Sequence, residues 1–209
     1  QYVLDYFKLK APRLVENVKT QVKDIEIRKT KGVSRGISLK NAWGLMQENN
    51  VVTLPRVTEE GLLEGVITIG DITKSYMNLY DSSIISKACT KYANILDTLE
   101  GSMVVGDSET YFDQGKVLIA AANPDLMENY IEKHDLVILG NRYESQLCAI
   151  EMEAGCIIVC EGAGVSLTIR KLAQERGCAV ITTPYDTYTT ARLINQSMPI
   201  SYFMTKENI

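Results

Sequence analysis

Histidine is nearly absent from this chain, because His134 is the only one among 209 residues. The sequence has five cysteines and no C-x-x-C pair among them: Cys89, Cys148, Cys156, Cys160 and Cys178. Zinc sites are built from clustered cysteine and histidine, so the sequence offers no metal site. An odd number of cysteines without a secretion signal indicates reduced, structural thiols in a cytoplasmic protein.

Two further absences narrow the class of protein. Lysine and arginine number 22 against 26 aspartate and glutamate residues, a formal net charge of −4, which argues against nucleic acid as a partner. No apolar run approaches the roughly 20 residues that span a bilayer, and no basic-then-apolar start resembles a signal peptide. The composition, 45% hydrophobic and 23% charged, is typical of a globular protein. We therefore expect a cytoplasmic protein without a membrane partner.

The first 80 residues divide into a connector and a small unit. Residues 1–17, which are amphipathic and broken by Pro12, predict a connector. Residues 18–80 show the pattern strand, helix, strand, strand, helix. Ser38 is a candidate N-cap, and apolar residues follow it at helical spacing: Leu39, Ala42, Trp43 and Met46. The β-branched runs "VVTLPRV" and "LEGVITI" predict strands, and "DITKSYMNLY" returns to helical spacing. Trp43 and the methionines on these helices are expected in the core.

A second unit, residues 92–199, alternates strand-like and helix-like segments. Short, continuous apolar runs are typical of buried strands in a parallel sheet, and four occur here: "KVLIAAA", "DLVILG", "CIIVC" and "CAVITT". The helix-like segments are "PDLMENYIEK", "YESQLCAIEMEA", "SLTIRKLAQERG" and "TYTTARLINQ". This alternation predicts right-handed βαβ crossovers. The predicted fold class is therefore α/β, with a small α+β unit followed by a βαβ-type domain that has a mainly parallel sheet.

The stretch "GVITIGDI" places Thr68 three residues before Asp71, where a strand passes into a helix. The residues alone leave two interpretations open. Asp71 could be an N-cap whose carboxylate accepts a backbone N–H. Alternatively, this carboxylate could accept the hydroxyls of a ribose, while Thr68 donates to a phosphate at the helix N-terminus.

The frame around this stretch resembles a CBS motif. The residues in register with that family are Ala42, Met46, Leu54, Pro55, Gly61, Gly65, Thr68 and Asp71. CBS domains bind adenosine nucleotides in a cleft between two paired motifs, and the resemblance implies that Thr68 faces the phosphate and Asp71 the ribose. It also implies that the backbone of two segments flanks the base: Gly32, Val33 and Ser34, and Val52, Thr53, Leu54 and Pro55.

Two positions depart from the CBS pattern. Gly70 stands where a longer and often basic side chain is frequent, which removes a possible phosphate contact. Arg56 stands where an apolar residue is usual, and it could face the ligand, a partner chain or solvent.

The second unit resembles a DRTGG domain, a family named for a Gly-Asp-Arg turn and a Thr-Gly-Gly turn. Both turns are altered here, to Gly140-Asn141-Arg142 and Glu161-Gly162-Ala163-Gly164. The glycine loop precedes a helix capped by Ser166 and could in principle cradle a phosphate. It has neither the lysine of a P-loop nor the G-x-G-x-x-G spacing, so we interpret it as a tight strand-to-helix turn. Pro184 to Thr187 are interpreted as a turn that caps the next helix.

The order of the units is the most specific indication of function. Residues 200–209 resemble the start of a second CBS motif, and a DRTGG domain between two CBS motifs resembles the regulatory insert of family II inorganic pyrophosphatases. The catalytic motifs of that family, the His-x-Asp-type metal ligands and the DHH triplet, are absent. We therefore expect no catalytic residue in this chain. The resemblance implies a parent diphosphatase that uses manganese or cobalt with magnesium.

The resemblance also implies how such a region acts. AMP and ADP would inhibit the parent enzyme, whereas diadenosine polyphosphates would bridge two sites of a homodimer and activate it by rearranging the dimer. Apolar strand residues that need cover favour a homodimer through the CBS units: Val52, Leu54, Val66 and Ile67. An alternative is a stand-alone α/β enzyme acting on an acyl or phosphoryl substrate, because DRTGG-like domains accompany phosphate acetyltransferases. No nucleophile–base pair supports that alternative.

Overall fold

The computed structural model describes residues 2–11, 19–27, 29–77 and 81–204. Predictions on residues 1, 12–18, 28, 78–80 and 205–209 lie outside the described residues. The α-helices are α1 (Tyr2–Tyr6), α2 (Leu39–Glu48), α3 (Ile69–Met77), α4 (Ile84–Lys87), α5 (Tyr92–Thr98), α6 (Pro124–Met127), α7 (Tyr143–Glu151), α8 (Leu167–Arg176) and α9 (Thr187–Leu193). Short 3₁₀ helices are η1 (Val22–Asp24), η2 (Ile194–Ser197) and η3 (Ile200–Tyr202). No described helix is long and apolar enough to cross a membrane.

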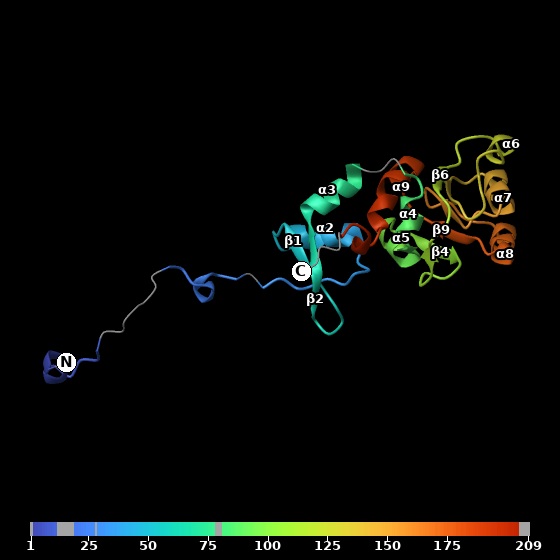
Figure 1. Cartoon of the computed structure of the whole chain (residues 1–209). Helices are drawn as coiled ribbons and strands as arrows, with labels where there is room; N and C mark the ends of the chain where they lie inside the picture. The colour runs from blue at the N-terminus through green and yellow to red at the C-terminus, as the bar shows by residue number, and fades with distance from the viewer. Residues whose placement is uncertain (1, 12–18, 28, 78–80, 205–209) are drawn as a thin grey trace.

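The strands form three sheets. They are β1 (Thr53–Val57), β2 (Leu63–Thr68), β3 (Thr90–Lys91), β4 (Ser102–Val105), β5 (Tyr111–Phe112), β6 (Val117–Ile119), β7 (Leu136–Leu139), β8 (Cys156–Val159) and β9 (Ala179–Thr182). β1 pairs with β2, β3 pairs with β5, and the remaining five strands form one sheet. Two units lie side by side, and the N-terminal residues extend away from both (Figure 1).

The first unit, residues 29–77, packs α2 and α3 against one face of the β1–β2 hairpin. Ser38 is the predicted N-cap, since its hydroxyl oxygen accepts the N–H of Asn41 at 3.1 Å. In the antiparallel register Leu54 lies opposite Ile67, and both side chains are buried with Met46 of α2. The apolar periodicity of the sequence therefore predicts these buried side chains correctly.

Two residues expected in the core are exposed instead. Trp43 is 40% exposed and Met77 is 72% exposed, whereas Met46 is buried as predicted. The unit has only two layers, one of helices and one of strands, so only one side of each helix has a sheet to cover it. Apolar residues on the outer side of α2 and α3 have no cover from the described residues.

The second unit, residues 81–204, is built on the five-stranded sheet in the order β4-β9-β8-β7-β6. The strands β6 to β9 are parallel, and β4 runs antiparallel to β9 at the edge. The four apolar runs of the sequence are these four parallel strands. The prediction of an α/β fold with a mainly parallel sheet is confirmed.

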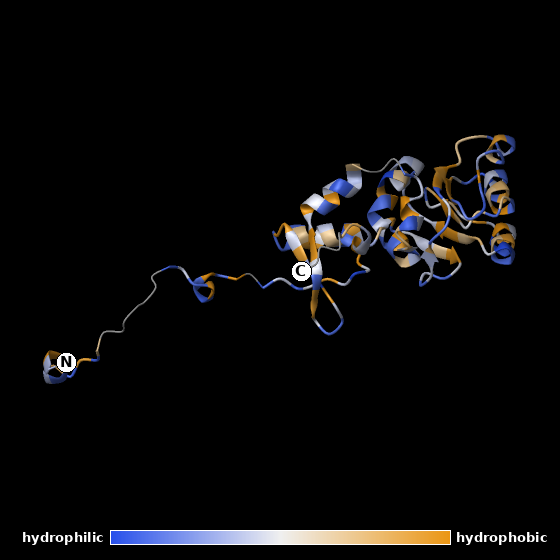
Figure 2. Ribbon diagram, viewed as in Figure 1, coloured by the Kyte–Doolittle hydropathy of each residue, from blue (hydrophilic) through white to orange (hydrophobic). Residues whose placement is uncertain are grey.

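Alternate residues of the central strands face two separate cores. Leu136 and Ile138 point to the side that carries α4, α5 and η2, whereas Val137 and Leu139 point to the side that carries α6, α7 and α8. Figure 2 shows the orange strands enclosed between these two layers of helices. Because both faces are covered, the strands are apolar at every position rather than at every second one.

Several elements of the second unit were not predicted. The strand β4 pairs Ser102 with Thr182, which is distant in the sequence, and α4, α5, β3 and β5 gave no periodic signal. The helix α6 is shorter than the predicted segment 124–133, because the chain turns back toward β7. The buried carboxylate of Asp135 fixes this turn by accepting the N–H groups of Glu132 and Lys116, each at 2.9 Å.

The two units share one continuous core and are joined by hydrogen bonds at both ends of the second unit. Near the C-terminal end of the second unit, the N–H of Leu39 donates to the Met198 oxygen at 3.0 Å, and the N–H of Ile200 donates to the Ile37 oxygen at 2.9 Å. In the N-terminal part of the second unit, Asp97 of α5 accepts hydrogen bonds from Lys40 Nζ and Asn41 Nδ2. The chain therefore passes from the first unit into the second unit and then returns to the first unit.

Four of the five thiols are buried, and Cys89 is exposed. Burial raises the pKa of the Cys178 thiol to about 12, and burial likewise raises the pKa of Cys156. These two cysteines behave as small apolar residues of the sheet.

Candidate functional site

The outer face of the β1–β2 hairpin carries the residues predicted to bind a ligand. Leu54 and Ile67 point inward, so their neighbours along each strand point outward. The register pairs Thr53 with Thr68 and Pro55 with Val66, and these two pairs therefore share the outer face. The structure thus brings together strand residues that lie more than ten positions apart in the sequence.

This face has exposed apolar side chains, but fewer than the sequence suggested. Val52 and Val66 are exposed, the latter by 46%. Leu54 and Ile67 were also expected to need outside cover, and that expectation is wrong because α2 and α3 of the same unit bury them.

A third chain segment extends the same surface along β1. The N–H of Val33 donates to the Pro55 oxygen at 2.9 Å, and the N–H of Val57 donates to the Val33 oxygen at 3.0 Å. Gly32–Ser34 therefore runs parallel to β1, with Val33 bridged to Arg56. The side chain of Val33 is buried, and both its N–H and its C=O pair with β1.

Thr68 and Asp71 form a reciprocal capping pair at the start of α3. Asp71 Oδ2 accepts the backbone N–H of Thr68 at 2.9 Å and the Thr68 hydroxyl at 2.7 Å. In return, Thr68 Oγ1 accepts the N–H of Asp71 at 3.2 Å. Because α3 begins at Ile69, Thr68 is the N-cap and Asp71 is the third helical residue.

This geometry corrects the interpretation of Asp71 as the N-cap. The carboxylate accepts a backbone N–H as expected, but it reaches back to the N-cap residue from inside the helix. The spacing Thr-x-x-Asp is the signature of a capping box, and it could have identified Thr68 as the cap. The β-branched residues before Thr68 indicate a strand, so the sequence did not show that the helix begins at Ile69.

The capping pair does not use all of the site's hydrogen-bonding capacity. Both hydrogen bonds from Thr68 go to Oδ2 of Asp71, which leaves the Oδ1 oxygen outside the capping pair. At the start of α3, the N–H of Ile69 donates to Val52 O at 3.1 Å and that of Asp71 donates to Thr68 Oγ1. The N–H of Gly70, the exposed second helical residue, lies between them in the sequence. The N-terminal end of a helix favours an anionic group.

Arg56 is paired within the unit. Its Nε lies 3.2 Å from Glu64 Oε2 of the neighbouring strand, and both side chains are partly buried. A register shift between Arg56 and Val57 accompanies this contact. Within the described residues, Arg56 therefore faces Glu64 with limited exposure to solvent, and its orientation toward a ligand or a partner chain stays a prediction.

Family models match both units of the chain. A CBS domain model matches residues 22–78, and a DRTGG domain model matches residues 94–197. A crystal structure of the CBS and DRTGG domains of the regulatory region of Clostridium perfringens pyrophosphatase, complexed with the activator diadenosine tetraphosphate, is 37% identical. It superposes with a TM-score of 0.84 over 91% of this chain and 83% of that chain. This chain belongs to the CBS–DRTGG regulatory regions of pyrophosphatases.

Full-length relatives agree with this membership. The cobalt-dependent inorganic pyrophosphatase of Clostridium perfringens is 38% identical over the whole of this chain, which covers 38% of that protein. A probable manganese-dependent inorganic pyrophosphatase of Thermotoga maritima is 27% identical over 99% of this chain, which covers 37% of it. The chain therefore spans less than two fifths of the length of these relatives. The resemblance inferred from sequence is confirmed, whereas the unit boundaries 18–80 and 92–199 stay predictions.

Gly32 of the CBS unit is required by the close approach of Val57. A Cβ at position 32 would lie 2.5 Å from both Val57 methyl carbons, whereas a Cβ at Gly36 would meet nothing within 4 Å. We expect Gly32→Ala to lower the free energy of unfolding by about 1–3 kcal/mol through overpacking, and Gly36→Ala to change it by less than about 0.5 kcal/mol. Chemical denaturation of both variants measures this, and equal stabilities would show that the 32–34 segment shifts freely.

The backbone N–H groups of the altered glycine turn donate to carbonyl oxygens of the DRTGG domain itself. The N–H of Glu161 donates to Tyr185 O and that of Gly162 to Thr183 O, each at 2.8 Å, and the N–H of Ala163 donates to Cys160 O at 3.3 Å. These three N–H groups are unavailable to a phosphate. The interpretation as a tight turn is confirmed, and the Ser166 hydroxyl caps the following helix as predicted.

The two other predicted turns shape helix starts in the DRTGG domain. Asp186 caps α9, since Oδ1 accepts the N–H of Thr189 at 2.9 Å and Oδ2 accepts its hydroxyl at 2.6 Å. These bonds lower the pKa of the Asp186 carboxyl. Arg142 occupies the N-cap position of α7 without a side-chain cap. Neither turn supports the alternative of an acyl- or phosphoryl-transferring enzyme.

Proposed function

We propose that this chain is the regulatory, adenine-nucleotide-binding part of a cytoplasmic inorganic pyrophosphatase. AMP and ADP inhibit the parent enzyme, and diadenosine polyphosphates activate it. The parent is proposed to hydrolyse pyrophosphate with manganese or cobalt and magnesium, whose ligands belong to the catalytic part and not to this chain. In this proposal the chain contributes ligand binding and no catalytic residue.

The observation that carries the proposal is the outer face of the CBS unit. Asp71 Oδ1 supplies an acceptor for ribose hydroxyls, and the N–H of the exposed Gly70 at the start of α3 supplies a donor for a phosphate. The segments Gly32–Ser34 and Val52–Pro55 lie beside them along β1, where they flank the proposed position of the base. A 37% identical region of the same architecture is described as complexed with diadenosine tetraphosphate, which supports an adenine ligand.

The ligand cleft is proposed to need a second CBS motif, which residues 200–209 open. The N–H of Ile200 donates to Ile37 O, and Met204 Cε lies 2.9 Å from where a Cβ of Gly65 would stand. The chain thus re-enters the CBS unit next to the β2 strand. A motif that continues from this point would cover Val52 and Val66 and enclose the nucleotide.

Calorimetry with AMP, ADP, ATP and diadenosine tetraphosphate tests the function on a parent protein that includes this region. We expect AMP to bind once per chain and the two-headed ligand once per pair of chains, because one ligand bridges two sites. Absence of binding heat for every adenine nucleotide would overturn the proposal. Pyrophosphatase or acetyltransferase activity in the isolated chain would favour the enzyme alternative instead.

Nucleotide control is proposed to act through a homodimer whose CBS units meet across a two-fold axis. Each ligand then biases the orientation of the subunits, with a coupling of about 1–3 kcal/mol. Light scattering of the parent protein is expected to give the mass of a dimer with and without AMP at roughly tens of micromolar protein. A monomer in both conditions would remove the dimer switch and leave only nucleotide binding.

A further inference from the structure

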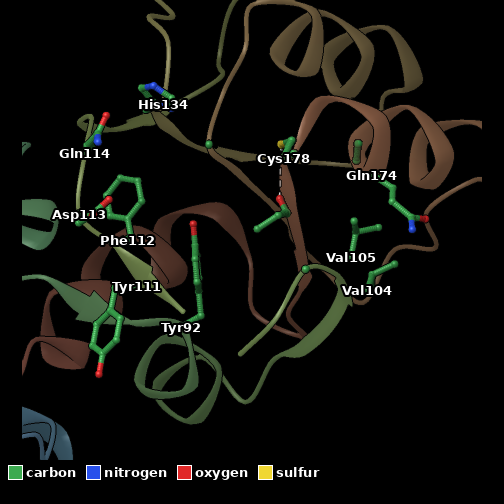
Figure 3. Close-up of a pocket in the computed structure, with 15 residues that line it drawn as sticks. Tyr92, Val104, Val105, Tyr111, Phe112, Asp113, Gln114, His134, Gln174 and Cys178 are labelled. Atoms are coloured by element: carbon green, nitrogen blue, oxygen red, sulfur yellow. Dashed lines mark hydrogen bonds between the residues drawn. The ribbon is translucent and has the colours of Figure 1, made fainter. Parts of the chain in front are cut away.

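A second concave site lies in the DRTGG domain, away from the CBS face. Its volume is about 720 Å³, which falls within the range of small-molecule sites. One wall is β5 with the residues that follow it, and the other is formed by β4, the start of β9 and the end of α8. Figure 3 shows Phe112 and Asp113 on the first wall, with Val104 and Val105 facing them from the second.

The side chain of Tyr92 projects between these walls. Tyr92 is only 7% exposed, and its hydroxyl points toward the middle of the cavity (Figure 3). Burial, together with the nearby Cys156 thiol, raises the pKa of Tyr92, so its hydroxyl is neutral and presents a lone pair. Asp113 lines the same cavity from the neighbouring wall, and its negative charge contributes to the raised pKa of Tyr92.

The lining of the cavity includes one carboxylate, from Asp113, and one imidazole, from His134. No lysine or arginine is among the described residues that line it. The C-terminal end of α8 also opens here, since Gln174 and Gly177 line the cavity. The C-terminal end of a helix carries the negative pole of its dipole. An anion is therefore disfavoured and a cation is favoured.

We propose that this cavity binds a small organic cation, a protonated amine with an apolar body. The ammonium group lies between the Asp113 carboxylate and the Tyr92 hydroxyl oxygen. The apolar body packs against Val104, Val105 and the Ala179 side chain on the opposite wall. An ammonium group near the ring of Tyr92 gains further attraction from the aromatic face.

Three probes of equal size and different charge test this: benzylamine, benzyl alcohol and benzoate. They are titrated into the whole chain while the amide resonances of Gly106, Gly155 and Gly177, which line the cavity, are followed by NMR. We expect benzylamine to shift these resonances with a dissociation constant near about 1 mM, and to bind more tightly than either isostere.

Two variants and a matched control test whether the charge at the cavity attracts the amine. Asp113→Asn removes the carboxylate, and Gln174→Lys adds a cation on the exposed surface of α8. Each is expected to weaken benzylamine binding about fivefold, the size typical of a partly exposed charge pair. Asp107→Asn makes the same charge change outside the cavity and keeps the oxygen that accepts the Glu109 N–H at 2.9 Å. It is expected to change binding by less than about twofold.

Three results would overturn the proposal. The first is equal or tighter binding of benzyl alcohol or benzoate. The second is no shift of the three glycine resonances up to about 10 mM benzylamine. The third is an Asp107→Asn effect as large as that of Asp113→Asn, which would mean that the amine responds only to net charge. None of these results depends on nucleotide binding by the CBS unit, so failure here leaves the proposed function intact.

Discussion

Asp71→Ala is expected to weaken AMP binding by about 10- to 100-fold, which corresponds to roughly 1.5–3 kcal/mol for a charge-assisted hydrogen bond. The carboxylate has an oxygen left over from capping, and the proposed site directs that oxygen to the ribose. Calorimetry of the variant in the parent protein measures the loss. A thermal melt of the same sample reports any loss of stability separately.

Asp186→Ala is the matched control for this variant. Each of the two carboxylates accepts one backbone N–H and one threonine hydroxyl at the start of a helix. Both substitutions should therefore lower the stability of the folded chain through lost capping. Only Asp71→Ala should lower the affinity for AMP. Unchanged AMP affinity in a destabilised Asp71→Ala protein would assign this residue to capping alone.

Gly115→Ala is expected to lower the stability of the DRTGG domain by about 2–5 kcal/mol. Gly115 has φ +85°, and a Cβ there would lie 2.3 Å from the His134 carbonyl oxygen. This obstacle is backbone, so no side-chain rotation relieves it. The left-handed conformation adds about 1–2 kcal/mol, and the overlap about 1–3 kcal/mol. The strain falls at the junction of β6 and β7, where the N–H of Leu136 donates to Lys116 O.

Gly162→Ala separates the two contributions. Gly162 has φ +63° in the same domain, but a Cβ there would meet nothing within 4 Å. This variant should show the conformational cost alone, about 1–2 kcal/mol. Urea denaturation followed by circular dichroism compares the two proteins. A Gly115→Ala protein as stable as Gly162→Ala would mean that the His134 turn yields to the added methyl group.

The parallel sheet could be predicted from the sequence because each strand carries its own signal. Strands buried on both faces are apolar throughout, and the helices between them begin at residues with caps, such as Ser166. The edge strand β4 has no such signal, since its position depends on pairing with β9 across a large separation in sequence. Trp43 shows the limit of periodicity, which predicts an apolar side of a helix without showing whether anything covers it.

The candidate site was predictable as a set of residues but not as an arrangement. The CBS resemblance named the segments, and the structure places them along the paired strands β1 and β2 and the segment 32–34 beside β1. The pairing of Arg56 with Glu64 depends on a local register shift that no residue type reveals. The capping pair had a readable spacing, yet the sequence does not show that one carboxylate oxygen is used and the other is left. The cavity beside Tyr92 joins segments whose contact is purely tertiary.

The return of the DRTGG domain to the CBS unit has a thermodynamic consequence. The chain leaves the CBS unit near α3 and returns to it at Ile37–Leu39. The folded DRTGG domain is therefore a long loop whose two ends are held close together. If the domain unfolds locally, that loop becomes a flexible tether, and holding its ends together carries a closure entropy that grows only slowly with length. The folded DRTGG domain then acts as a rigid spacer between α3 and the returning residues 198–204. Its stability sets how firmly those residues are held against the CBS unit.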